Sequence, residues 1–195
     1  MKQKLRRAVF LDRDGTLNKM VYYPDHGIVD SPFVPSQLGL LPGVPEALKI
    51  LRRKGFMLML VSNQPGVAKG NMGEKDFVAV CNRFDSLLAK HGIELDAKYY
   101  CMHHPGSKLA KYRKNCRCRK PKAGLLLAAA REHGIDLKSS YMAGDGIVDV
   151  KAGHAAGCKT VFIGAFKPEL WQYLKGGKKP EIIAKSILDA AKKMK

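Results

Sequence analysis

The chain has 195 residues, of which 46% are hydrophobic and 27% are charged. These values are typical of a folded protein with a real core, and they exclude disordered and collagen-like chains. The length predicts a single domain over residues 1–195 and excludes a large modular protein.

Basic residues outnumber acidic ones by 35 to 17, which gives a formal net charge of +18. The excess is concentrated in residues 2–7, with four cations and no acid, and in residues 108–122, with eight cations and no acid. A polyanionic partner would explain it, either a phosphorylated substrate steered by charge or nucleic acid contacted non-specifically. A solvated basic surface is the alternative, and charge alone does not separate the two.

The apolar runs are too short for membrane insertion or export. Residues 56–61 and 125–130 are among the longest, far below the ~20 residues that span a bilayer. Near the N-terminus, the basic residues precede only four apolar ones at 8–11, too few for a signal peptide. We therefore expect a cytoplasmic protein with no membrane partner.

Short apolar runs alternate with helical patterns along the chain. The runs are typical of parallel strands covered on both faces, at residues 8–11, 56–61, 97–100, 141–143 and 160–163. Helical patterns are predicted at residues 45–54, 74–90, 125–133, 148–156 and 180–195, the last packing Ile182, Ile183, Ile187 and Leu188. This order predicts an α/β fold, a Rossmann-like parallel sheet with helices on both faces and ligands at the carboxyl ends of its strands.

Two carboxylates follow the first predicted strand. Asp12 and Asp14 are two positions apart, and Gly15 permits a sharp turn directly after them. Two converging carboxylates repel each other unless a cation lies between them, and Mg²⁺ binds a few carboxylates together with phosphate oxygens. The pattern indicates a magnesium site, against the alternative of an acidic turn.

The sequence Asp-x-Asp-Gly-Thr after an apolar strand resembles the first motif of the haloacid dehalogenase superfamily of phosphatases. Three further motifs of that superfamily follow in order, each at a predicted strand end or helix start. They are Ser62 after the second strand, Lys120 before the third main helix, and Asp145 after the fourth strand. Four matches in order make a coincidence improbable.

The resemblance implies a mechanism through an aspartyl-phosphate. Asp12 would attack phosphorus, and Asp14 would protonate the leaving oxygen and then activate water. Mg²⁺ would bind the Asp12 carboxylate, the Asp14 carbonyl and Asp145. Ser62 and Lys120 would hold the phosphoryl oxygens. Asp149 would support Lys120 or a metal-bound water.

The cysteines indicate a second metal site. Cys101-x-His103 and Cys116-x-Cys118 are two pairs of ligands separated by twelve residues, which suits a closed, structural, tetrahedral Zn²⁺ site in a loop over residues 101–118. Such clustering favours a metal over disulfides in a reducing compartment. His104 is the competing ligand for His103, and chance clustering of thiols is the remaining alternative. Zinc would direct the next residues, Arg119 and Lys120, toward the phosphate.

Taken together, these motifs look like the heptose-bisphosphate phosphatases, in the histidinol-phosphatase-like branch of the superfamily. The resemblance covers about residues 8–163. It implies hydrolysis of the 7-phosphate of D-glycero-D-manno-heptose 1,7-bisphosphate, in the synthesis of nucleotide-activated heptose. The implied substrate contacts are Asn63, Gln64, Arg119 on the distal phosphate, and the loop Asp25, His26 and Gly27. We expect a monomer with an open site, because the segments between the motifs leave no room for a large cap domain.

Three alternatives compete with this interpretation. Histidinol-phosphate phosphatases share the four motifs and a similar zinc loop, but their substrate has no second phosphate for Arg119. A polynucleotide 3′-phosphatase would explain the charge, but the chain shows no Gly-rich kinase loop and no aromatic stacking stripe. A non-enzymatic zinc-bearing nucleic-acid module would leave the aspartates without a purpose. We therefore expect no specific nucleic-acid partner.

Overall fold

A six-stranded parallel sheet forms the centre of the computed structural model, which describes residues 5–165 and 168–195. The strand order is β5-β4-β1-β6-β7-β8, and each neighbouring pair is parallel. The strands are β1 (Ala8–Leu11), β4 (Met57–Asn63), β5 (Ala97–Cys101), β6 (Tyr141–Gly144), β7 (Lys159–Ile163) and β8 (Ile182–Ala184). The predicted Rossmann-like architecture is confirmed.

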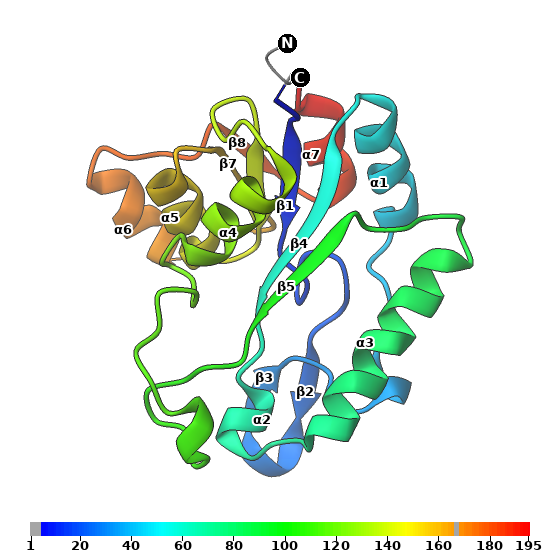
Figure 1. Cartoon of the computed structure of the whole chain (residues 1–195), viewed down its shortest axis with the longest axis vertical. Coiled ribbons are helices and arrows are strands. Elements are labelled where there is room, and N and C mark those ends of the chain that lie inside the picture. Colours follow the sequence, from blue (N-terminus) through cyan, green and yellow to red (C-terminus); the bar gives the residue numbers. More distant parts are fainter. Residues whose placement is uncertain (1–4, 166–167) are drawn as a thin grey trace.

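Helices cover both faces of this sheet (Figure 1). Along β1, Val9 and Leu11 point into one core cluster, while Ala8 and Phe10 point into the other, as the two-residue period of a strand requires. The first cluster is covered by α1 (Val44–Arg53), α3 (Glu74–Ala89) and α7 (Ile187–Lys193), the second by α4 (Gly124–His133) and α5 (Ile147–Ala156). Helix α6 (Pro168–Lys175) packs Leu170 against α5 and β7 in a third, smaller cluster. Burial on both faces explains why the strands read as continuous apolar runs.

The order in which strands are added to the sheet changes sides at β1. The connection from β1 leads to β4 on one side, whereas β6 joins β1 on the other side only after β5 and α4. The backbone N–H of Asp12 donates to the carbonyl of Ala143 at 3.0 Å, which fixes the ends of β1 and β6 side by side. Such a switch point at the carboxyl ends of parallel strands is where ligands bind in open α/β sheets.

Small elements surround this switch point. Strands β2 (Val21–Tyr23) and β3 (Ile28–Asp30) form an antiparallel hairpin around η1 (Pro24–His26), followed by η2 (Pro35–Gln37). Helix α2 (Gly66–Lys69) follows β4 and lies beside the hairpin in Figure 1, and η3 (Ala110–Tyr112) lies in the loop after β5. The sequence pattern did not predict these pieces, because each is too short to show a hydrophobic period. The described residues contain no larger insertion above the sheet.

The predicted helix over residues 180–195 is wrong in its first half. Residues Ile182 to Ala184 instead add the edge strand β8 to β7, with Ile182 opposite Val161. The helix begins only after Ser186, whose side chain accepts a hydrogen bond from the N–H of Asp189 at 3.2 Å. A neighbouring strand edge, which the sequence does not reveal, overrode the local helical pattern.

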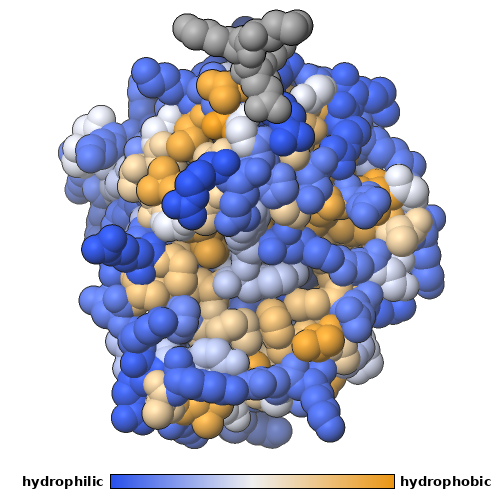
Figure 2. All heavy atoms as spheres, viewed as in Figure 1, coloured by the Kyte–Doolittle hydropathy of each residue, from blue (hydrophilic) through white to orange (hydrophobic). Residues whose placement is uncertain are grey.

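The surface is predominantly polar. On the face shown in Figure 2, hydrophilic side chains form the rim and hydrophobic ones gather toward the middle. The longest helix among the described residues, α3, has 16 residues. None of the described helices is long and apolar enough to cross a bilayer.

Candidate active site

Lys120 lies at the floor of the site with its ammonium group between two carboxylates. The Nζ atom is 2.7 Å from Asp12 Oδ1 and 2.6 Å from Asp149 Oδ1, and it donates to the carbonyl of Val61 at 2.8 Å. Burial acts to lower the pKa of Lys120, but Asp12 and Asp149 outweigh it and raise that pKa above its usual range. The side chain, 1% exposed, is therefore a fixed positive charge beside Asp12.

Three carboxylates lie close together beside Lys120: Asp12 after β1, Asp145 after β6 and Asp149 in the first turn of α5. Ligand oxygens of Asp12, Asp145 and Asp149 all lie within 4.8 Å of one another. Gly15 has φ +81°, and a Cβ there would come within 2.6 Å of Asp145 Oδ2, so only glycine leaves that carboxylate its place. Burial raises the pKa of Asp149, an effect that the charge of Lys120 opposes. Three carboxylates and one ammonium group leave an excess of negative charge at this place. A divalent cation that prefers oxygen ligands, such as Mg²⁺, fits this excess.

Asp14 is held by donors from three side chains. Arg13, which is completely buried, donates from Nε to Oδ1 and from Nη2 to Oδ2, both at 3.2 Å. Asn18 Nδ2 donates to Oδ1 at 2.9 Å, and Gln64 Nε2 donates to Oδ2 at 2.5 Å. Burial acts to lower the pKa of Arg13, but its contacts with Asp14 raise it. The orientation of Asp14 is thus fixed by a buried network.

Ser62 and Asn63 end strand β4, which extends two residues beyond the predicted run and so includes them. Ser62 Oγ accepts a hydrogen bond from Gln64 Nε2 at 3.0 Å, so its own proton is left for a ligand. The Asn63 amide is already occupied, because its Oδ1 accepts from Lys120 N and its Nδ2 donates to Lys120 O, both at 3.0 Å. The geometry gives Asn63 the task of positioning Lys120.

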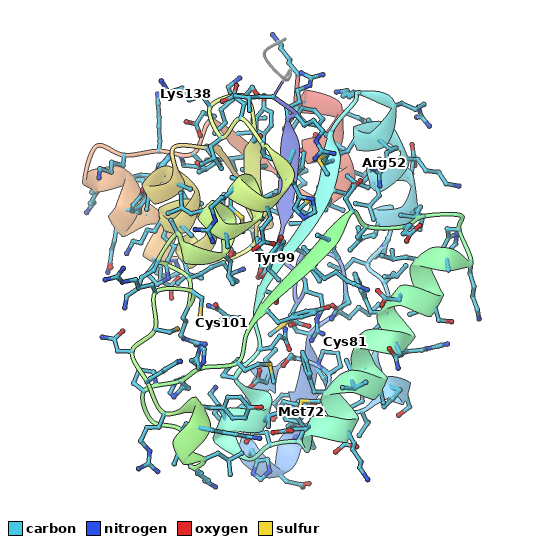
Figure 3. The ribbon with its side chains drawn as sticks, viewed as in Figure 1. Arg52, Met72, Cys81, Tyr99, Cys101 and Lys138 are labelled. Carbon is cyan, nitrogen blue, oxygen red and sulfur yellow. The ribbon has the colours of Figure 1, made fainter. Side chains whose placement is uncertain are left out.

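Three sulfurs and one imidazole meet where the chain leaves β5. Figure 3 shows Cys101 at the end of that strand, next to the long loop. The Sγ atoms of Cys101, Cys116 and Cys118 are 3.1 to 3.5 Å apart, and His103 Nδ1 is 3.3 Å from Cys118 Sγ. A tetrahedral zinc site with Zn–S bonds of about 2.3 Å has edges of about 3.8 Å, so these four ligands fit one ion with little movement.

His104, the competing ligand, points elsewhere. Its Nδ1 accepts a hydrogen bond from the N–H of Gly106 at 3.1 Å, and it is not a member of the four-ligand cluster. Burial, followed by the charges of Arg119 and Lys69, lowers the pKa of His104. The imidazole is therefore engaged by its own loop and is not one of the four clustered ligand groups.

A cleft of about 220 Å³ lies at the carboxyl end of the sheet, beside Asp12, Asp14 and Lys120. Its wall includes the predicted residues Asp12, Asp14, Ser62, Asn63, Arg119 and Lys120. It also includes Met20, Asp30, Ser31, Pro65, Lys69 and Val148, which the sequence analysis did not single out. The cleft thus combines carboxylates with several cations, an arrangement that suits phosphoryl transfer.

Comparisons with known proteins agree with this chemistry. A family model described as HAD-hydrolase-like matches residues 117–190. The D-glycero-β-D-manno-heptose-1,7-bisphosphate 7-phosphatase of Pasteurella multocida is 40% identical over 192 residues, which cover 98% of each chain. The protein of the same name from Escherichia coli K12 is 40% identical over 162 residues, covering 83% of this chain and 81% of that one. This chain belongs to the heptose-bisphosphate phosphatase family of HAD-like hydrolases.

A solved structure extends the likeness of this phosphatase to three dimensions. The crystal structure of D,D-heptose 1,7-bisphosphate phosphatase from B. bronchiseptica, complexed with magnesium and phosphate, matches with a TM-score of 0.76 and 26% identity. The match covers 96% of this chain and 97% of that one. The resemblance predicted from the four motifs is confirmed.

Two sets of expected substrate contacts lie outside the cleft of this phosphatase. Asp25 and His26 belong to η1, and Gly27 ends it with φ +60°; all three are exposed on the β2–β3 hairpin. Gln64 is 2% exposed, and its amide serves Arg13, Asp14 and Ser62. Arg13, which contacts Asp14, was not predicted as a site residue. Its place in the sequence, a cation between the two aspartates of the motif, was the one signal that could have indicated it.

Proposed function

We propose that this phosphatase removes the 7-phosphate of D-glycero-D-manno-heptose 1,7-bisphosphate in the synthesis of nucleotide-activated heptose. The observation that carries the proposal is the carboxylate of Asp12, 2.7 Å from a buried ammonium group in a cleft that also contains Arg119. Relatives at 40% identity bear the name of that activity and specify the β anomer, which we propose as the preferred substrate.

Asp12 acts as the nucleophile in the first step. One of its oxygens attacks phosphorus, the bond from phosphorus to the sugar oxygen breaks, and an aspartyl-phosphate forms. Asp14 gives its proton to the leaving sugar oxygen. Lys120 holds Asp12 through Oδ1, which leaves the other carboxylate oxygen for the attack.

Water releases the phosphate in the second step. Asp14, now a carboxylate, accepts a proton from the water as the water oxygen attacks phosphorus. The acyl-phosphate bond breaks, inorganic phosphate leaves, and Asp12 is restored. The hydrogen bonds from Arg13, Asn18 and Gln64 hold Asp14 for both proton transfers.

A positive charge and a hydrogen-bond donor in the cleft offset the charge of the phosphate. Lys120 supplies a fixed positive charge, and Ser62 has a hydroxyl proton free to donate to a phosphoryl oxygen. A magnesium ion held by Asp12, the Asp14 carbonyl and Asp145 would screen the charges that keep nucleophile and phosphate apart. The structural zinc ion would bind to Cys101, His103, Cys116 and Cys118, away from the reacting atoms.

We propose that the enzyme works in the cytoplasm as a monomer, without a nucleic-acid or membrane partner. Its five cysteines form no disulfide, as is usual in a reducing compartment. The acids in the cleft would repel a polynucleotide backbone while a metal ion accommodates a small phosphate ester.

The test is phosphate release with Mg²⁺ from both anomers of heptose 1,7-bisphosphate, histidinol phosphate and a 3′-phosphorylated oligonucleotide. We expect a preference of about 100-fold in kcat/KM for the β bisphosphate, or about 2.7 kcal/mol of transition-state discrimination. Asp12→Asn should abolish turnover, whereas the matched control Asp85→Asn on α3 should retain it. A flat substrate profile, or a preference for histidinol phosphate, contradicts the substrate. Residual activity in Asp12→Asn contradicts the nucleophile.

A further inference from the structure

Lys69 is a cation of the cleft that the reaction steps leave without a task. It is the last residue of α2 and lines the cleft together with Asp12 and Arg119. Its side chain is 39% exposed, so its ammonium group can meet a ligand without first being uncovered. Its partner is Asp30, at the end of β3, with 3.8 Å between Lys69 Nζ and Asp30 Oδ2.

The pair with Asp30 is loose. At 3.8 Å the two atoms are beyond hydrogen-bonding distance, and Asp30 Oδ1 is already used by the N–H and hydroxyl of Ser31, at 2.7 and 3.2 Å. Asp30 therefore holds Lys69 near the cleft and leaves its ammonium protons available. A dianionic phosphate would bind this ammonium group more strongly than one distant carboxylate does.

Lys69 and Arg119 both line the cleft although they come from different segments: Lys69 ends α2, and Arg119 directly follows Cys118. Arg119 is fixed from the zinc loop side, with its N–H donating to Cys116 Sγ at 3.3 Å. Two cations that face one space repel each other unless an anion joins them.

In the proposed mechanism the reacting phosphate lies at Asp12, Ser62 and Lys120, which line one part of the cleft wall. The family resemblance already assigns Arg119 to the second, non-reacting phosphate. We propose that Lys69 binds that phosphate together with Arg119 and determines the preference for a bisphosphate over a monophosphate. This inference rests on the proposed function, because it presupposes a substrate with two phosphates.

Binding of a remote phosphate changes KM more than kcat, because the contact is the same in the ground state and the transition state. We expect Lys69→Met to raise KM for heptose 1,7-bisphosphate by about tenfold or more and to leave kcat within about twofold. For heptose 7-phosphate, which has no second phosphate, both constants should stay within about twofold. Lys69→Arg, which keeps the charge, should restore most of the affinity for the bisphosphate.

Lys111→Met is the matched control. Lys111 lies in the basic segment 108–122, pairs with Glu74 and is not part of the cleft wall, so its loss should change the kinetics of neither substrate. Thermal melting and zinc content verify that each variant is folded. Equal losses on both substrates, or no loss in Lys69→Met, would overturn the role of Lys69. If the wild-type enzyme itself does not prefer the bisphosphate, the proposed function fails instead.

Discussion

Arg13 is a buried charge that would serve the proposed chemistry through Asp14, because it is not part of the cleft wall. Its guanidinium spans both oxygens of Asp14 and also donates to Gln64 Oε1 at 2.8 Å. A planar fork with fixed donors orients a carboxylate in a way that a single ammonium group does not. Asp14 can therefore transfer protons from one defined position, provided that Arg13 remains in place.

Replacing Arg13 should slow substrates according to their leaving groups. In Arg13→Lys, which keeps the charge but loses the fork, kcat for heptose 1,7-bisphosphate should fall by about 10²-fold, because its alkoxide must be protonated. For p-nitrophenyl phosphate, whose leaving group needs no proton, kcat should fall by less than about tenfold. Steady-state kinetics on both substrates measure the difference.

Arg131→Lys, at an exposed position on α4, is the control for this change. It should leave both substrates unaffected. If Arg13→Lys slows the two substrates equally, Arg13 does not act on protonation of the leaving group.

Among the elements, the segment between β5 and α4 depends most on its metal ligands. It begins at Cys101, ends just before Arg119 and Lys120, and contains little regular structure besides η3. Its contacts with the rest of the molecule include Ala68, whose carbonyl accepts from Ser107 Oγ and Lys108 N at 2.8 and 2.9 Å, and Glu74, which accepts from Tyr112 Oη at 2.9 Å. Because these contacts are polar, a zinc ion would supply much of the energy that orders the segment.

Removal of zinc should therefore open this segment and reduce activity. With a strong chelator, trypsin should cleave between residues 108 and 117, where Lys and Arg are dense, and mass spectrometry should identify the cut. Activity with saturating Mg²⁺ should fall by about tenfold or more, since Lys120 follows the last ligand, Cys118, by only two residues and would move with the opened segment. Added zinc should reverse both effects. Cleavage that proceeds equally with zinc bound would contradict the structural role of this site.

On the scale of the whole molecule, the net charge of +18 surrounds an acidic centre. Asp12, Asp145 and Asp149 lie together at the end of the sheet, while basic residues fill the neighbouring loop at 108–122. A positive field outside the cleft attracts an anion from a distance, and the metal and Lys120 then accept its phosphate. Charge of one sign around a cleft raises the rate at which a substrate of opposite charge associates with the enzyme.

The reaction should consequently depend on ionic strength. Between about 20 mM and about 300 mM sodium chloride, kcat/KM for the bisphosphate should fall by about tenfold, because salt screens the attraction. For heptose 7-phosphate, with fewer charges, the fall should be smaller. Sucrose at matched osmolarity serves as the control. Equal salt dependence for the two substrates would show that the overall field does not distinguish them.

The sequence by itself determined the alternation of strands and helices and the order of the reactive motifs. Both are local properties: apolar runs record burial on two faces, and Asp12, Ser62, Lys120 and Asp145 each stand where a strand ends or a helix approaches. Parallel strands share one carboxyl edge, so residues far apart in the chain had to meet there. The two ligand pairs of the zinc loop could also be predicted, because the members of each pair are only two residues apart in the sequence.

Only the tertiary structure decided which side chains share partners. It brought His103 together with the three thiols, engaged the amides of Asn63 and Gln64 with Lys120 and Asp14, and placed Lys69 beside Asp30. It also turned residues 182–184 into an edge strand, against their helical pattern. These outcomes depend on segments that meet across the fold, where a hydrogen bond or a strand edge outweighs the local preference of the chain.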